Sequence, residues 1–357
     1  MKIATTPEID ALLKTNAPVA IGVSGGKDSQ AAALATEAHL DAIGHNGPRV
    51  LIHADLGVVE WNASLSTCER LAAHLGLELI VVRRKAGDLM DRWESRWESS
   101  VERYANLATV TLVPCWSTPS MRFCTSELKT HVITAELKRR YKSQTIINVT
   151  GVRRQESKAR SKGTVAGPDA TGRIWNWRPL SDWSTPEVFA YVTGRGLPVH
   201  IGYTEYGLTR ISCRFCIMSS IADLIAAAMA PESHDLYRRM VALEIASTFA
   251  FQGSRWLGDV RPMLLGFEQS DAFMRAKEMA LARVKIESRI TNGMLYVKGW
   301  PTRMLTDEEA GILAGVRLDL AQLFGWHIRY TDSLSIHHRY AELMNEAEDR
   351  AEAKGLK

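Results

Sequence analysis

Four apolar runs in the first part of the chain, separated by turns and helix-like segments, predict the core of an α/β fold. The runs are Val19–Val23, Arg49–Ala54, Leu77–Val82 and Thr145–Thr150. Short apolar runs bounded by turn residues are typical of strands that are buried on both faces, and the alanine- and leucine-rich stretches between them are typical of helices. The pattern therefore predicts a parallel sheet flanked by helices.

The chain beyond residue 220 has a different pattern, in which helix-forming stretches dominate. We expect helices over most of it, including the charged tail Asp332–Lys357, with one short strand-like piece at Met294–Lys298. The change of pattern predicts two domains, an α/β domain over residues 1–220 and a mostly helical region over residues 221–357.

Three local patterns inside the first part refine this picture. Trp93 and Trp97 are four residues apart, so they share one face of a helix, where a core-facing stripe is favoured over a contact surface. Ser184–Glu187 combines a capping hydroxyl, a proline and an acidic residue, which predicts a helix start. Ser161–Gly172 is rich in glycine and polar residues, which predicts a mobile loop, a lid or a hairpin.

Composition and charge change the picture only modestly. The 357 residues are 46% apolar and 24% charged, with a net charge of +4, which is too small to argue for nucleic acid alone. We find no run that is long and apolar enough for a membrane span and no signal peptide, so we expect a cytoplasmic protein. Its five cysteines are then expected to be thiols, metal ligands or catalytic groups rather than disulfides.

The most informative stretch directly follows the first apolar run and consists of Ser24, Gly25, Gly26, Lys27, Asp28 and Ser29. A strand, a glycine turn and a helix in that order direct free backbone N–H groups at an anion, and the two glycines let a phosphate approach closely. Lys27 adds a positive charge. Asp28 is expected either to cap the following helix or to help hold a magnesium ion beside phosphates.

Charged residues also follow the second and fourth runs. Asp55 ends the second run, where it would accept from a nucleotide hydroxyl, support a metal, or simply stabilise a turn before Gly57. Arg153, Arg154 and Arg160 follow the fourth run closely. Because the carboxyl ends of parallel strands meet at one edge of a sheet, we expect these guanidinium groups near the glycine-rich loop, where they suit phosphate or sulfate.

In these patches the chain resembles the PAPS reductase domain family of the PP-loop, or N-type ATP pyrophosphatase, superfamily. The patches are Ser24–Ser29, Asp55–Gly57, Arg122–Lys129, Gly151–Arg160 and Trp177–Trp183. The resemblance implies an adenine-nucleotide α-hydrolase-like fold. It implies a nucleotide site that includes the Ser24–Ser29 loop, Asp55, Lys129, Gly151, Arg153 and Arg160, with Glu156 orienting an arginine. Lys27, Asp28 and Cys124 are the expected catalytic residues.

The cysteines depart from the pattern of the reductases. Reductases of this family that work with thioredoxin have a nucleophilic cysteine near the C-terminus, whereas the last cysteine here is Cys216. Cys213 and Cys216 form a C-x-x-C pair, Cys124 is a distant third thiol and Cys115 a possible fourth, a set that suits a metal. The arrangement is similar to PP-loop enzymes that hold a [4Fe–4S] cluster, including tRNA-thiolating enzymes and DndC-like proteins of DNA phosphorothioation. Zinc, free thiols and a redox pair remain alternatives, and Cys68 is expected to be buried.

Three functions follow as hypotheses. The first is an enzyme that cleaves magnesium-bound ATP to AMP and pyrophosphate, adenylates an acceptor and transfers sulfur to it. The second is a reductase acting on PAPS or APS, and the third is a non-catalytic nucleotide-binding subunit of a larger complex. An adenine nucleotide, ATP or PAPS, is the expected ligand, and a sulfur-donor protein such as a cysteine desulfurase is an expected partner. A nucleic-acid substrate, DNA or RNA, and a small-molecule acceptor both stay open.

Overall fold

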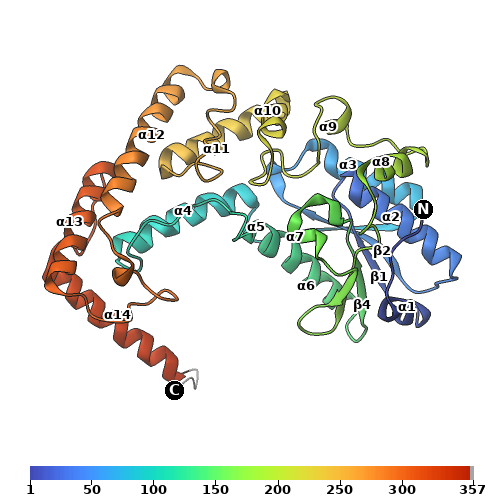
Figure 1. Ribbon diagram of the computed structural model, residues 1–357, viewed down its shortest axis with the longest axis horizontal. Coiled ribbons are helices and arrows are strands. Elements are labelled where there is room, and N and C mark those ends of the chain that lie inside the picture. The colour runs from blue at the N-terminus through green and yellow to red at the C-terminus, as the bar shows by residue number, and fades with distance from the viewer. Residues whose placement is uncertain (354–357) are drawn as a thin grey trace. The chain divides into compact units, whose positions relative to one another are not determined.

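The computed structural model describes residues 1–353, which form two compact units (Figure 1). The first unit comprises Met1–Met90 and Ser117–Tyr237. The second comprises Asp91–Trp116 and the chain from Arg238 onward. The expected division at residue 220 stays a prediction about domains.

The first unit is built on a six-stranded sheet with the order β3-β2-β1-β4-β6-β5. All neighbouring strands are parallel except β5 and β6, which pair antiparallel. The strands are β1 (Val19–Gly22), β2 (Arg49–Asp55), β3 (Glu78–Arg83), β4 (Ile146–Val149), β5 (Ala166–Pro168) and β6 (Ile174–Trp177). The four predicted strands and the α/β fold class are confirmed. The segment predicted as a loop or hairpin contains β5, the short edge strand that pairs with β6.

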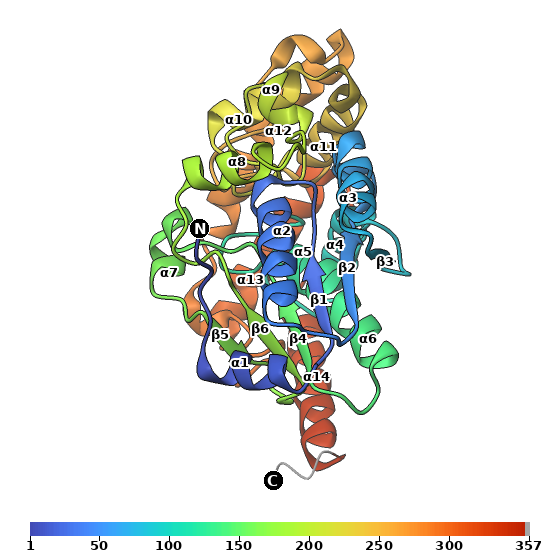
Figure 2. The same cartoon turned by 90° about the vertical axis from the view of Figure 1, so that its right-hand side faces the viewer.

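Helices cover both faces of this sheet (Figure 2). Those of the first unit are α1 (Pro7–Lys14), α2 (Lys27–Ala42), α3 (Asn62–Leu75), α5 (Phe123–Thr125), α6 (His131–Arg140), α7 (Lys158–Ser161), α8 (Thr185–Thr193), α9 (Ile201–Thr204) and α10 (Ile221–Met229), with 3-10 turns η1 (Gly57–Val59), η3 (Arg154–Glu156) and η4 (Pro231–Ser233). A π-helical turn, η2 (Ser126–Thr130), joins α5 to α6. The predicted start of α8 is confirmed, because Ser184 caps it and forms a capping box with Glu187.

Alternation along β1 explains why the sheet needs both layers. Val19 and Ile21 pack into a core with α1, α2, α3 and α8, whereas Ala20 packs into a second core with α6. Because successive side chains of a strand point to opposite faces, a strand without polar positions is stable only between two helical layers. Cys68, on α3, is buried in the first of these cores as expected.

The second unit is helical. It contains α4 (Leu89–Ala105) from Asp91 onward, α11 (His234–Ser247) from Arg238 onward, α12 (Phe267–Glu287), α13 (Asp307–Phe324) and α14 (Ser333–Ala353), with 3-10 turns η5 (Pro262–Leu264) and η6 (Asn292–Met294). Trp93 and Trp97 are buried, which confirms the core interpretation. The predicted strand at Met294–Lys298 is wrong: Met294 ends η6, and Val297 forms an isolated bridge with Trp300. The helical tail is confirmed as far as Ala353, and its last four residues lie outside the described residues.

Arg317 organises the second unit. Its side chain is fully buried, and its guanidinium donates to the backbone carbonyls of Tyr104, Ala105, Arg329 and Tyr330 at 2.6–3.0 Å. These bonds join α13 to the end of α4 and to the loop that precedes α14. Burial lowers the pKa of Arg317, whose guanidinium is held by these carbonyls and lies over the Tyr104 ring at 4.9 Å.

Replacing Arg317 with methionine should therefore destabilise the protein by about 3 kcal/mol or more, because several buried carbonyls lose their donors. Urea unfolding followed by circular dichroism measures the change. The matched control is Arg275→Met, since Arg275 forms an exposed pair with Asp271 and its loss should cost less than about 0.5 kcal/mol. Equal effects of the two substitutions would show that the buried guanidinium does not organise this unit.

Candidate anion site and cysteine loop

The first part of the site is the turn between β1 and α2, which we call the glycine turn (Ser24–Ser29). Gly25 has a φ of +75°, a left-handed conformation that residues with a Cβ rarely adopt. The Ser29 hydroxyl accepts from the N–H of Ser24 at 3.2 Å and donates to the Gly26 carbonyl at 2.9 Å. The turn is therefore preshaped, and it leads into a helix start whose first N–H groups have no acceptor within the helix.

Lys27 and Asp28 lie within a network of their own. Lys27 is buried, with its ammonium 3.0 Å from an Asp28 carboxylate oxygen and over the rings of Phe189 and Tyr203 at 5.5 and 5.4 Å. The other Asp28 oxygen accepts from Arg153 Nε at 2.7 Å. Asp28 does not cap α2, because the capping position is occupied by Gly26, so that alternative is wrong. Its carboxylate instead bridges two cations.

The loop after β4 is joined to the glycine turn at the point where the strand order reverses, which is where doubly wound sheets bind ligands. A Cβ on Gly151 would lie 2.4 Å from the Asp28 carbonyl oxygen, so only glycine permits this approach. Arg153 is buried and, besides Asp28, donates to the Trp183 carbonyl at 3.0 Å and the Thr185 hydroxyl at 3.1 Å. Arg153 therefore joins the loop after β4 to the glycine turn and to the start of α8.

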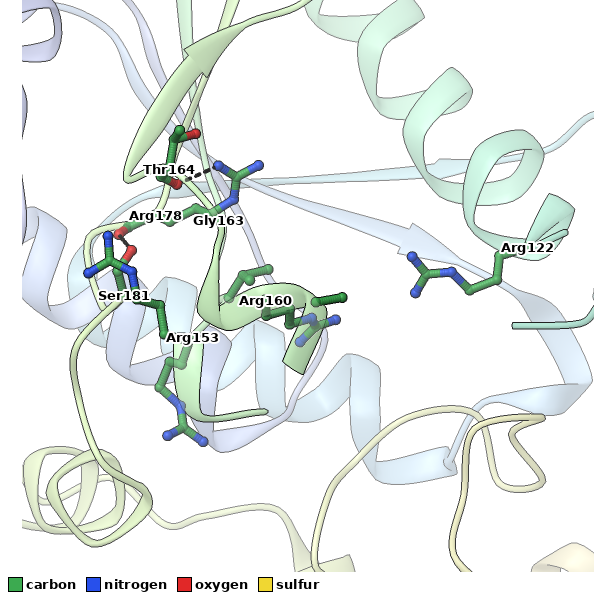
Figure 3. A pocket seen from close by; sticks show the side chains of 10 residues that line it. Arg122, Arg153, Arg160, Gly163, Thr164, Arg178 and Ser181 are labelled. Carbon is green, nitrogen blue, oxygen red and sulfur yellow. Dashed lines mark hydrogen bonds between the residues drawn. The ribbon is translucent and has the colours of Figure 1, made fainter. Parts of the chain in front are cut away.

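A cavity of about 360 Å³ opens beside this loop (Figure 3). Five of the residues that line it are arginines: Arg122, Arg153, Arg154, Arg160 and Arg178. Figure 3 shows Arg122 reaching toward the cavity from one side and the other labelled arginines lying on the opposite side. Glu156 forms an ion pair with the Arg160 guanidinium, so it orients this arginine, and its carboxylate also accepts from the backbone N–H of Arg153 at 2.9 Å. The cavity suits an anion such as phosphate or sulfate.

Asp55, at the end of β2, is occupied by local partners. One carboxylate oxygen accepts from Gly57 N at 2.7 Å, and the other forms an ion pair with Arg83. Burial raises the pKa of Asp55, but these two hydrogen bonds and the Arg83 charge outweigh it, and the pKa lies below its usual value. The geometry matches the turn interpretation, and contact with a nucleotide or metal stays a prediction.

Three of the four expected metal ligands lie in the first unit, and we call them the cysteine trio (Cys124, Cys213 and Cys216). Cys124 is in α5, directly before the π-helical turn that carries Lys129. Burial raises the pKa of the Cys213 thiol, the nearby Lys129 ammonium lowers it, and the thiols of Cys216 and Cys124 raise it further. The trio and Lys129 are therefore electrostatic neighbours.

The C-x-x-C pair lies on a loop between α9 and α10 that is fastened at several points. Arg214 donates through its backbone N–H to the Val59 carbonyl at 2.8 Å and through Nε to the Glu60 carbonyl at 2.6 Å. Asp223 closes the loop by accepting from Thr209 N at 2.8 Å. This segment, which we call the cysteine loop (residues 209–220), is thus held against the start of α3 and against α10.

The fourth expected ligand, Cys115, is not part of the first unit. Cys115 belongs to the second unit, where it is fully buried and its thiol donates to the Ser247 hydroxyl at 3.7 Å. Burial raises its pKa to about 12, so it is a neutral core thiol at physiological pH. Among residues 1–353, no group of three or more His, Cys, Asp or Glu side chains has the arrangement of a metal site. Metal ligation by these cysteines stays a prediction.

Sequence reasoning missed a buried charged pair beside the cysteine loop. His53 is fully buried in β2, with Nδ1 3.0 Å from the Val23 carbonyl oxygen and Nε2 3.0 Å from the Glu60 carboxylate. Both ring nitrogens face acceptors, which favours the imidazolium. Burial lowers the pKa of His53, but its hydrogen bonds to Cys68 and Glu60 and the Glu60 charge raise it to about 10. A histidine within an otherwise apolar run was the only signal in the sequence.

Comparisons with known proteins bear on this site. The model of the phosphoadenosine phosphosulfate reductase domain family matches residues 18–219. A search of curated proteins found no match. None of the helices in residues 1–353 is long and apolar enough to cross a membrane.

Solved structures give matches of low identity. One is phosphoadenylyl-sulfate (PAPS) reductase from Candida auris in a phosphate complex, at 17% identity and a TM-score of 0.36, covering 60% of this chain and 98% of that one. Another is the U34-tRNA thiolase NcsA from Methanococcus maripaludis with its [4Fe–4S] cluster, at 16% identity and a TM-score of 0.40, covering 67% of this chain and 74% of that one. A third is the NH3-dependent NAD synthetase from Campylobacter jejuni, at 14% identity and a TM-score of 0.28, covering 75% of this chain and 89% of that one.

The close approach of Gly151 leads to a prediction about anion binding. Gly151→Ala should displace the backbone of Asp28, because the new Cβ would overlap its carbonyl oxygen. We expect the affinity for inorganic pyrophosphate, measured by calorimetry, to fall about tenfold or more, or by about 1.4 kcal/mol. Gly167→Ala is the matched control, since a Cβ there meets nothing nearer than 3.9 Å. Unchanged binding by the Gly151 variant would remove this junction from the site.

The His53–Glu60 pair predicts a pH dependence of stability. The folded-state pKa of about 10 lies above the unfolded value of about 6.5, so the stabilisation is complete below pH 6.5 and is lost as pH rises through 10. The free energy of unfolding should fall with a slope of up to about 1.4 kcal/mol per pH unit across that window. His53→Gln should be less stable at pH 6.5 and should lack this part of the slope. Parallel profiles of the two proteins would contradict the charged pair.

Proposed function

The chain belongs to the phosphoadenosine phosphosulfate reductase domain family, and from this premise we propose that it is an enzyme of sulfur metabolism that uses ATP to activate an acceptor. An acceptor oxygen attacks the α-phosphate of magnesium-bound ATP, pyrophosphate leaves, and the acceptor carries AMP. A sulfur nucleophile then displaces AMP from the acceptor. Whichever acceptor it uses, the protein would be an enzyme of this family that depends on an adenine nucleotide.

One observation carries the proposal: the glycine turn, where we propose that the nucleotide phosphates bind, lies next to the loop that carries two cysteines. Gly26 and Ile211, two residues before Cys213, are neighbours, since a Cβ on Gly26 would meet Ile211 Cβ at 3.5 Å. An enzyme that joins phosphate chemistry to sulfur transfer needs these two functions side by side, because the activated acceptor must meet sulfur before water does.

The residues have distinct roles in this scheme. The N–H groups at the start of α2 bind the leaving pyrophosphate, and the preshaped turn already directs them toward it. Lys27 and Arg153, joined through Asp28, keep the region positive, and the arginines of the cavity bind the remaining anionic groups. Gly151 permits the close packing of the two loops. Magnesium enters with ATP as part of the substrate.

The cysteine trio supplies the sulfur chemistry. A sulfur-donor protein, such as a cysteine desulfurase, transfers a sulfur atom to one thiol as a persulfide. The terminal sulfur attacks the adenylated carbon and AMP leaves, and a second thiol then cleaves the resulting disulfide and leaves sulfur on the acceptor. An external dithiol reduces the cysteine pair afterwards. The described side chains do not form a preassembled metal site, and a [4Fe–4S] cluster or zinc held by the cysteine trio stays a prediction.

The arginine-lined cavity favours a second candidate, reduction of PAPS or APS. A sulfate and a second phosphate would each find guanidinium donors there. One thiolate of the trio would attack the sulfonate sulfur and release the nucleotide, and a second thiol would then displace sulfite. The two thiols become a disulfide and supply the two electrons.

The deciding experiment compares ligands and products on one anaerobic preparation whose iron and zinc have been measured. We expect magnesium-bound ATP to bind at least about tenfold more tightly than PAPS by calorimetry, and pyrophosphate to be released when the acceptor is supplied. Lys27→Met should lower the affinity for ATP about tenfold or more, whereas Lys14→Met makes the same change at an exposed position and should have no effect.

Each other outcome has a definite meaning. Preference for PAPS with release of sulfite would return the protein to the reductases. Tight binding of either nucleotide without turnover would favour a non-catalytic subunit. If a folded Lys27 variant binds both nucleotides like the native protein, the glycine turn is not the nucleotide site and the proposal fails.

A further inference from the structure

Tyr203 connects the glycine turn to the cysteine loop. Its hydroxyl oxygen accepts from the backbone N–H of Lys27 at 3.2 Å and from the backbone N–H of Ile211 at 3.3 Å. A Cβ on Gly26 would lie 3.6 Å from the same oxygen. One oxygen atom therefore holds the first residue of α2 and a residue that lies two positions before Cys213.

The hydroxyl occupies a position that an anion would take. Lys27 is the first residue of α2, so its N–H has no acceptor within the helix and is one of the groups that bind phosphate at a helix start. Burial raises the pKa of Tyr203 to about 12, so the phenol is neutral at physiological pH. A neutral oxygen accepts more weakly than a phosphate oxygen, which can therefore displace it.

The second contact of the Tyr203 hydroxyl, with Ile211, affects the reactivity of the thiols on the cysteine loop. The Tyr203 bond to Ile211 holds the front of the cysteine loop, while Asp223 and Arg214 hold the rest. Cys213, two residues after Ile211, is only partly exposed in this arrangement. Release of Ile211 frees the backbone beside Cys213, so that reagents and an acceptor reach its thiol more easily.

We propose that Tyr203 is a positioning residue that couples occupancy of the glycine turn to the reactivity of Cys213. A phosphate bound at the turn takes the Lys27 N–H from the phenol oxygen, and the front of the cysteine loop then opens. The proposal rests on the proposed function in one respect, namely that a phosphate binds at this turn. It adds an order of events, in which the thiol is unmasked only after the nucleotide has bound.

The test uses inorganic pyrophosphate as the probe and iodoacetamide as the thiol reagent, with alkylation of each cysteine followed by mass spectrometry. In the native protein, pyrophosphate should accelerate alkylation of Cys213 about threefold or more. Cys115, buried in the second unit, is an internal reference that should not respond. In Tyr203→Phe, Cys213 should react faster without pyrophosphate, and the probe should have no further effect.

The phenylalanine variant should also bind pyrophosphate about two- to tenfold more tightly, because the competing hydroxyl is gone. Coupling between two binding equilibria is reciprocal, so alkylation of Cys213 should tighten pyrophosphate binding in the native protein and leave it unchanged in the variant. Tyr206→Phe is the matched control. Tyr206 lies three residues further on, its ring stacks on Trp61 at 5.6 Å, and its loss of a hydroxyl should change neither measurement.

The outcomes distinguish a failure of the coupling through Tyr203 from a failure of the proposed nucleotide-dependent function. If pyrophosphate does not bind to the native protein, both proposals fail. If it binds but alkylation of Cys213 does not change, or if Tyr203→Phe responds like the native protein, the coupling through Tyr203 is wrong and the nucleotide site is unaffected. A thermal unfolding curve of the variant establishes that it is folded before either result is interpreted.

Discussion

The site depends on one carboxylate placed between two buried cations. Asp28 pairs with Lys27 at 3.0 Å and with Arg153 at 2.7 Å, and both cationic side chains are about 3% exposed. Two buried positive charges without a counter-charge would cost several kcal/mol each, so the loops after β1 and β4 hold this geometry only while Asp28 is between them. The close backbone approach at Gly151 is the steric condition for that bridge.

This network satisfies the charges of the site without a ligand, and the hydrogen-bond donors of the site are therefore already bound to protein groups. The Lys27 ammonium lies over two aromatic rings, the Lys27 backbone N–H donates to a phenol oxygen, and Arg153 donates to protein acceptors. An entering anion gains affinity only by exchanging these partners, which limits binding strength. When the anion displaces these partners, it also changes how they hold other segments of the protein, and one of those segments is the loop with Cys213.

Much of the fold could be predicted from the sequence, because β1 to β4 lie in short apolar runs ended by turns, and runs of that length between turn residues favour buried strands. The three-residue β5 and the mixed β6, with Trp175 and Asn176, lack that signal. The strand expected at Met294–Lys298 failed because a strand needs a neighbour, and Val297 finds only Trp300. For the site, parallel strands bring their loops together, which places the glycine turn beside Gly151. The bonds that join Tyr203 to Lys27 and Arg153 to Asp28 connect residues more than a hundred positions apart in the sequence, which no local pattern encodes.

Cysteine spacing in the sequence shows which thiols can meet, but burial and neighbouring charge decide which can react. Cys115 and Cys213 both have a pKa raised by burial, yet their surroundings differ. Cys115 is fully buried in the second unit, and its thiol donates to a serine hydroxyl. Cys213 is half-buried, lies near the Lys129 ammonium and belongs to a loop held partly by a displaceable hydroxyl. A thiol that is masked but close to a cation suits chemistry that must wait for its substrate, because water and oxidants find little thiolate before the site is filled.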